Sequence, residues 1–288
     1  MSKTPEDIIK RANKKAKPFL GVFTNKFDQE DAIELYEQAA HLYKVQGEPL
    51  KAANTFLKGA ELARSINNYD AAKLYSLAGD FFKHADRPLL SSDAMNTAIH
   101  IYLDEGMGRN ASKLYVKLAE AEDDLDKRLE LYQAAVDQIK YEEHSNIYTL
   151  KLKIVDILIT IEQYQEAIKV YQELIDSKII TGTIWLLADL CAKQCLCYLT
   201  NDDIVGCERQ MSVHEDQLPA LDNHREYKFL SNIVASLKDC DKEYFNQIMY
   251  EEDRVKTFSP LMVKMLLKIK DQFMEPEDDI TTSEDELC

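Results

Sequence analysis

The sequence predicts an all-α protein: a TPR-like right-handed superhelical solenoid of antiparallel helix pairs, closed by a C-terminal helical bundle. Three observations lead to this class. Glycine and proline are scarce, with 8 and 7 in 288 residues, so turns are too few for a β architecture. A short motif recurs at an interval of about 40 residues, which is typical of repeat proteins. Pairs of alanines near aromatic residues recur with it, as close helix packing requires.

The repeat is visible in the motif Asp31–Tyr36, which returns as Asp70–Tyr75 and again as Asn110–Tyr115, at spacings of 39 and 40 residues. A second series joins Lys127–Tyr132 to Glu166–Tyr171, again 39 residues apart. Each interval accommodates two helices and exceeds the TPR period of about 34 residues, so the helices should be longer than those of a standard TPR.

Alanine pairs at 39–40, 52–53, 71–72 and 134–135 allow neighbouring helices to approach closely. Asp31, Asp70 and Asn110 are expected to cap helix N-termini, and Gly47 and Gly106 to follow helix C-termini.

We expect three parts: a TPR-like solenoid over residues 1–200 with an N-terminal membrane-contact loop near 18–27, a helical bundle over 201–274, and an acidic tail over 275–288. Pro260 should open the last helix, which should end near Phe273. A closed four-helix bundle is disfavoured because roughly ten helices are predicted.

The formal charge of −16 argues against nucleic-acid partners. No apolar run reaches the roughly 18 residues of a membrane span, and no signal peptide is evident, so a cytoplasmic protein is expected. The cysteines should be reduced and mostly buried. Cys191, Cys195 and Cys197 lack the second cysteine pair of a zinc site, which disfavours a metal.

Catalytic signatures are also missing from the sequence. It contains no GxxxxGK[ST] phosphate loop and no HExxH motif, and its carboxylate pairs lie on predicted solvent-facing helix surfaces. We therefore expect no enzyme activity and no cofactor.

Phe19, Leu20, Val22 and Phe23 form an apolar stretch broken by glycine and flanked by lysines. Such a segment suits insertion into an anionic membrane surface. The alternative is a helix connection whose aromatic rings fold back on the first repeat.

Lysines recur on the predicted repeat helices of this acidic chain and could line one side of the solenoid: Lys113, Lys117, Lys151, Lys153 and Lys193. They would then face an acidic partner. The alternative is that they are ordinary exposed charges.

The chain ends with an apolar helix and an acidic segment that includes Asp278, Asp279 and the aliphatic Ile280. Its alternative interpretation is a solvated tail of no specific function.

From about residue 8 to residue 280 the chain resembles the soluble NSF attachment proteins, the adaptors of SNARE disassembly. The motif FLGVF at 19–23 matches their aromatic membrane loop. Residues 70–86, 161–168 and 265–270 are similarly close. The alpha type fits best, although the acidic Leu-Cys ending is also similar to the gamma type.

The resemblance implies an adaptor that binds a SNARE four-helix bundle and recruits and stimulates the hexameric NSF ATPase, in vesicle fusion and ER–Golgi transport. It implies that Lys113, Lys153 and Lys193 face the bundle, while a further family lysine falls on Thr149. The ATPase-contacting leucine falls on Ile280, with Leu287 as the competing candidate near the end of this longer tail.

The resemblance also implies a protein that is monomeric alone, gathers in several copies around one SNARE bundle, and is peripheral on membranes. Two other interpretations stay open. One is a generic TPR-like scaffold that binds peptides, and the other is a look-alike that binds SNAREs or NSF without completing disassembly.

Overall fold

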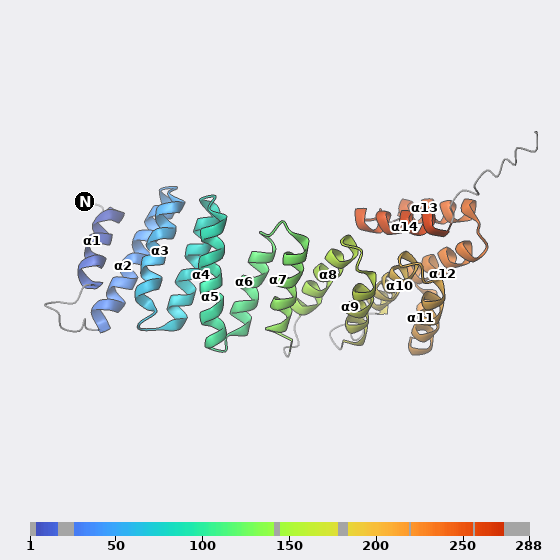
Figure 1. Ribbon diagram of the computed structural model, residues 1–288, viewed down its shortest axis with the longest axis horizontal. Coiled ribbons are helices and arrows are strands. Elements are labelled where there is room, and N and C mark those ends of the chain that lie inside the picture. The colour runs from blue at the N-terminus through green and yellow to red at the C-terminus, as the bar shows by residue number, and fades with distance from the viewer. Residues whose placement is uncertain are drawn as a thin grey trace, which may run out of the picture. The chain divides into compact units, whose positions relative to one another are not determined.

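The computed structural model describes residues 4–16, 26–140, 145–177, 184–218, 220–255 and 257–273. All regular secondary structure in these ranges is helical, with no strand (Figure 1). The predicted all-α class is confirmed. The chain separates into two compact units, Met1–Glu142 and Glu143–Cys288, which are described one at a time.

The N-terminal unit is a row of helices in which each packs against the next along the chain. Such sequential stacking is the arrangement of a helical-repeat protein. The helices are α1 (Pro5–Ala16), α2 (Lys26–Val45), α3 (Pro49–Ala63), α4 (Asn68–His84), α5 (Pro88–Asp104), α6 (Gly108–Ala119) and α7 (Leu125–Asp137).

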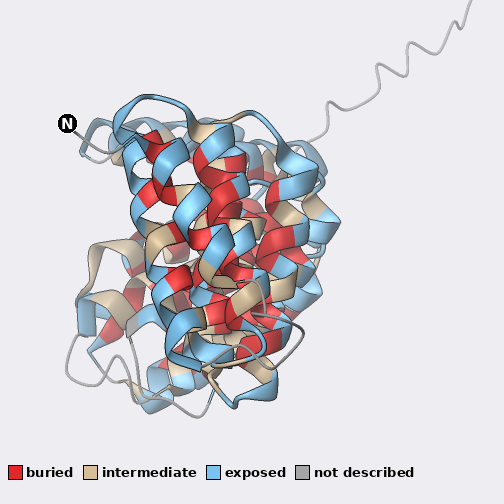
Figure 2. Cartoon of the chain, turned by 90° about the vertical axis from the view of Figure 1, so that its left-hand side faces the viewer, coloured by how far each residue is buried: buried red, intermediate tan, exposed pale blue. Residues whose placement is uncertain are grey.

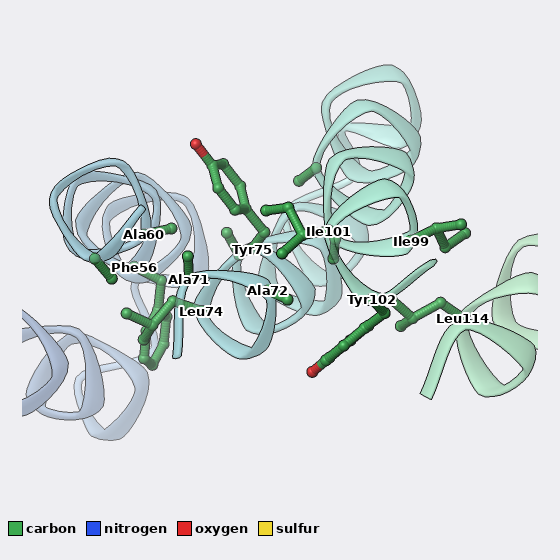
Figure 3. Close-up of a cluster of buried hydrophobic side chains, with 14 of the residues drawn as sticks. Phe56, Ala60, Ala71, Ala72, Leu74, Tyr75, Ile99, Ile101, Tyr102 and Leu114 are labelled. Carbon is green, nitrogen blue, oxygen red and sulfur yellow. The ribbon is translucent and has the colours of Figure 1, made fainter. Parts of the chain in front are cut away.

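The core of this unit alternates alanine with large apolar side chains. Ala71 and Ala72 of α4 are fully buried and lie between Phe56 of α3 and Ile99 of α5 (Figure 3). Each large buried side chain stabilises the fold by about 1.5–3 kcal/mol. Figure 2 shows buried residues on the helix faces that meet and exposed residues on the outer faces.

The helix ends depend on glycine and proline, as the sequence indicates. Gly47 and Gly106 follow α2 and α5 with φ of 74° and 69°, a conformation that favours glycine. Pro49 and Pro88 open α3 and α5, where a missing N–H costs nothing.

The predicted N-caps Asp31, Asp70 and Asn110 are wrong, because the helices begin earlier than their motifs. Asp31 lies inside α2, and Asp70 and Asn110 lie in the first turns of α4 and α6. The cap of α4 is Asn67, whose side chain accepts hydrogen bonds from the N–H groups of Tyr69 and Asp70.

In the C-terminal unit, α10 is the hub: it packs against α9, α11, α12 and α14, and α14 also contacts α8. Pro260 opens the last helix and Phe273 ends it, as predicted. The elements are α8 (Ser145–Thr160), α9 (Tyr164–Asp176), α10 (Ile184–Thr200), α11 (Ile204–Gln217), the 3-10 turn η3 (Leu221–Asn223), α12 (Arg225–Lys238), α13 (Lys242–Val255) and α14 (Pro260–Phe273).

The predicted division into a solenoid over 1–200, a bundle over 201–274 and a tail over 275–288 stays a prediction. The two compact units meet after residue 142, between α7 and α8. Of the predicted loop at 18–27, Lys26 and Phe27 belong to α2, and the rest lies outside the described residues, as does the tail.

Candidate functional site

The two candidate lysines of the N-terminal unit lie four residues apart on α6 but have different surroundings. Lys113 is exposed and forms no ion pair or hydrogen bond with any residue that the structure describes. Lys117 is half-buried, and its Nζ lies 2.8 Å and 2.7 Å from the two carboxylate oxygens of Asp80 on α4. Lys113 is therefore the side chain better placed to meet an external acidic group.

A groove of about 660 Å³ opens beside Lys117. Apolar side chains of α5, α6 and α7 form much of its lining, including Leu89, Met95, Leu118 and Leu131. Positively charged lysines and negatively charged carboxylates also line the groove, so its charge is mixed. Nothing in the sequence signalled this groove, because its shape depends on how α5, α6 and α7 pack against one another.

The lysines of the C-terminal unit lie among carboxylates. Lys193 Nζ on α10 lies 2.6 Å from Asp189 Oδ2, one helical turn earlier. Lys151 Nζ on α8 lies 2.7 Å from Glu173 Oε2 of α9. Lys153 is half-buried on α8 and also interacts within the chain.

A second carboxylate, that of Asp156, interacts electrostatically with Lys193. Desolvation beside the neighbouring helices raises the pKa of Asp156 on α8, and the positive charge of Lys193 opposes that shift. Two acids and one lysine therefore share this part of the unit, and the local field is less positive than the lysine spacing suggested.

The membrane-loop candidates Phe19, Leu20, Val22 and Phe23 lie outside the described residues, as do the tail candidates Asp278, Asp279, Ile280 and Leu287. Their flanks are described. On α1, before the loop, Lys10, Arg11 and Lys14 are exposed, while Lys15 pairs with Asp28 and Asp31 of α2.

Four of the five described cysteines are core residues, in line with the prediction that most are buried, and Cys240 is exposed. Cys191, Cys195, Cys197 and Cys207 are fully buried, and burial raises the pKa of the Cys191 thiol to about 12. Across the described ranges, no group of three or more His, Cys, Asp and Glu side chains is arranged to hold a metal ion. Within the same ranges, no helix is both long and apolar enough to cross a bilayer.

Helices that each pack against the next along the chain define a helical-repeat protein. The family model "Soluble NSF attachment protein, SNAP" matches residues 3–274. The chain belongs to the soluble NSF attachment protein family. This is a family of non-enzymatic adaptors that act in NSF attachment and vesicle fusion.

Individual relatives agree with this membership. The alpha-soluble NSF attachment protein of Mus musculus is 28% identical over 269 residues, which cover 91% of this chain and 90% of the relative. That of Saccharomyces cerevisiae is 28% identical over 291 residues, 96% and 99% of the two chains. The beta-soluble NSF attachment protein of Bos taurus is 27% identical over 260 residues, 87% and 86% of the two chains.

Sequence reasoning missed the acidic partners of the candidate lysines. The pair Asp189–Lys193 has the i,i+4 spacing of a helical ion pair and was visible in the sequence. The pair Asp80–Lys117 joins α4 to α6, 37 residues apart, and needed the fold to be seen.

Proposed function

We propose that this chain is an adaptor that binds SNARE four-helix bundles and recruits and stimulates the hexameric NSF ATPase for SNARE disassembly. The observation that carries the proposal is the family match over residues 3–274, which includes every residue that the structure describes. The NSF-binding activity in the names of the relatives is that of those proteins, and the proposal extends it to this chain.

The proposed SNARE contact is electrostatic and centres on Lys113, with Lys117, Lys153 and Lys193 in supporting roles. Lys113 is exposed, and its charge is not neutralised by a described carboxylate. Lys117 and Lys193 would have to exchange an internal carboxylate for one on the partner, which weakens their net contribution.

The other proposed contacts are the apolar loop with Phe19, Leu20, Val22 and Phe23 on an anionic membrane surface, and the tail with Ile280 on the ATPase. The exposed basic residues of α1 support the first, because cations near an anionic leaflet contribute about 1 kcal/mol each. In this proposal the protein is cytoplasmic, peripheral on membranes, monomeric alone and present in several copies around each bundle.

The decisive experiment is a SNARE-disassembly assay with purified NSF-type ATPase, with and without this protein. Disassembly that requires the protein supports the adaptor. Bundle or ATPase binding without disassembly would identify the look-alike instead. Binding of unrelated peptides, with no response to the bundle, would identify a generic TPR-like scaffold.

The SNARE face is tested by Lys113→Glu, which should raise the dissociation constant for the soluble bundle about tenfold. Lys58→Glu on α3 is the matched control, because it makes the same charge change at another exposed lysine. Binding of the wild type should weaken as salt rises. Equal effects of the two substitutions would assign the loss to net charge and remove Lys113 from the site.

A further inference from the structure

One face of the last helix, α14, carries three polar side chains at i, i+4 and i+8. Lys264 Nζ donates to the carbonyl oxygen of Thr160 at 3.4 Å, and Gln272 Nε2 donates to the carbonyl oxygen of Thr200 at 3.2 Å. Between them, Lys268 Nζ lies 2.6 Å from Glu162 Oε2. The spacing places all three on one side of the helix.

The two carbonyl groups occupy equivalent places in the repeat. Thr160 ends α8 and Thr200 ends α10, one repeat apart along the chain. The last carbonyls of a helix lack intrahelical partners and carry a partial negative charge. Side-chain donors from α14 therefore cap the C-terminal ends of α8 and α10, which occupy equivalent positions in two successive repeats.

Glu162, in the turn between α8 and α9, is the acceptor at the centre of this contact. Its carboxylate lies 2.6 Å from Lys268 Nζ and 3.6 Å from Lys264 Nζ. The hydrogen bond with Lys268 is the main reason that the pKa of Glu162 is lowered. Lys268 Nζ also lies 4.7 Å from the ring centroid of the buried Tyr164, within cation–π range.

The backbone at Glu162 is left-handed, as it also is at Asp86, Asp202 and Cys240. Its φ is 62°, the left-handed conformation that Gly47 and Gly106 supply at the ends of α2 and α5. A glutamate in this conformation costs free energy that a glycine would avoid. What distinguishes Glu162 is the contact of its side chain with Lys264 and Lys268 of α14.

Single exposed ion pairs contribute little to stability, and Glu162 is 50% exposed. Here two lysines, one ring and a helix end converge on one corner, and they act beside an apolar face formed by Met265, Leu266 and Ile269, which are buried. Apolar packing tolerates small rotations and slips. Charge pairs with fixed partners select one register of the helix.

We propose that Glu162 is a positioning residue that locks the register of α14 and so fixes where the C-terminal segment from residue 274 departs from the C-terminal unit. The role rests on the proposed function, since that segment is the one proposed to contact the ATPase. Glu162 itself touches neither the ATPase nor the SNARE bundle in this mechanism.

The structural test is amide hydrogen exchange of the full-length protein. Glu162→Gln should raise the exchange rate of the α14 amides about fivefold, while α9 and α12 stay protected. Glu166→Gln is the matched control, because it removes the same charge from a glutamate that also pairs with a lysine at 2.6 Å. That lysine, Lys169, is on α9 and not on α14. Unchanged exchange in α14 would overturn the proposal.

Glu162→Gly serves as the second variant, since it relieves the left-handed backbone while removing the carboxylate. It should keep or raise the overall melting temperature and still loosen α14. Protection of α14 that survives in this variant would show that the apolar face alone holds the helix, and would also overturn the proposal.

The functional test measures ATPase stimulation against adaptor concentration. Glu162→Gln should raise the half-maximal concentration about fivefold and leave maximal stimulation unchanged, because the tail is intact but less well placed. Glu166→Gln, the matched control, should leave the curve unchanged. An unchanged curve in Glu162→Gln would remove the positioning role. A wild-type protein that fails to stimulate the ATPase would instead overturn the proposed function.

Discussion

His214 on α11 is a fully buried histidine in the C-terminal unit. Its Nε2 lies 3.0 Å from the amide nitrogen of Gln210, and its Nδ1 lies 3.9 Å from the sulfur of Cys195. An amide nitrogen only donates, so Nε2 is the acceptor and the ring proton resides on Nδ1. Burial lowers the pKa of His214 to about 4, with Asp176 opposing the shift.

This shift predicts acid sensitivity of the fold. The folded state resists protonation of His214, whereas the unfolded chain takes up the proton near pH 6.5. The free energy of unfolding should therefore fall as pH drops from about 6.5 to 4, by on the order of 3 kcal/mol from this group. Urea unfolding across that range measures it.

His214→Gln is the control for this pH effect, because an amide can keep one hydrogen bond and cannot be protonated there. The variant should lose the His214 part of the pH slope, even if it is less stable at neutral pH. Wild type and variant with parallel pH profiles would show that His214 does not contribute.

At the level of single residues, the sequence predicted burial better than pairing. The clustered cysteines were correctly interpreted as core positions, since small apolar groups in a helical run need no specific partner. The ion pair of Lys117 depends on how α4 and α6 approach, which no local pattern encodes. The predicted N-caps failed because the motif marks the packed face of a helix and not its start.

Among the helices, α4 and α5 approach each other very closely at Gly79. A β-carbon built there would lie 2.7 Å from Met95 Cγ and 3.1 Å from the carbonyl oxygen of Ser91. The Ser91 hydroxyl donates back to the Gly79 carbonyl oxygen at 2.9 Å. Backbone and side chain of α5 thus leave room for a hydrogen atom only.

Gly79→Ala should destabilise the N-terminal unit by about 1–2 kcal/mol, because the overpacking penalty exceeds the gain in helix propensity. Chemical denaturation gives the value. Gly59→Ala on α3 is the comparison, since its β-carbon would meet only Tyr36 Cβ at 3.3 Å and Leu74 Cδ1 at 3.5 Å. A larger loss at Gly59 than at Gly79 would contradict this view of the α4–α5 contact.

The presence of stacked helices followed from the repeat, because each motif must bury one face against a neighbour, but roughly ten were predicted and the described residues form 14 α-helices. The boundary between the two compact units did not follow from the repeat. It falls between α7 and α8, where the sequence shows neither a proline nor a glycine cluster. Unit boundaries depend on which helices share a core, and that is a property of the packing.

The C-terminal segment gives a prediction for one element. If Ile280 enters a small apolar pocket of the ATPase, its burial is worth about 1.5–3 kcal/mol. Ile280→Ala should then abolish most ATPase stimulation and leave SNARE binding unchanged. Deletion of residues 281–288 should have little effect. The reverse pattern would assign the contact to Leu287, and no effect of either change would exclude the tail from the mechanism.

At the scale of the whole molecule, the proposed function joins three weak contacts in one chain. A loop on the membrane, lysines on the bundle and a tail on the ATPase need not be strong alone, because each contact makes the next one effectively intramolecular. The protein has a formal charge of −16, and two of its candidate lysines are paired internally, so their attraction for an acidic partner is modest. The joined contacts at the membrane and the ATPase make up for that weakness.

Membrane-anchored and soluble SNARE bundles separate these contacts. The wild type should bind bundles on anionic liposomes about tenfold to hundredfold more tightly than soluble bundles, because loop and lysines then act together. Phe19→Ser with Phe23→Ser should remove that difference and leave binding to soluble bundles unchanged. Lys113→Glu should weaken both by the same factor, since it removes the same contact with the bundle in each case. If the double serine variant instead loses affinity for soluble bundles, the aromatic rings are part of the first repeat, and the membrane role fails.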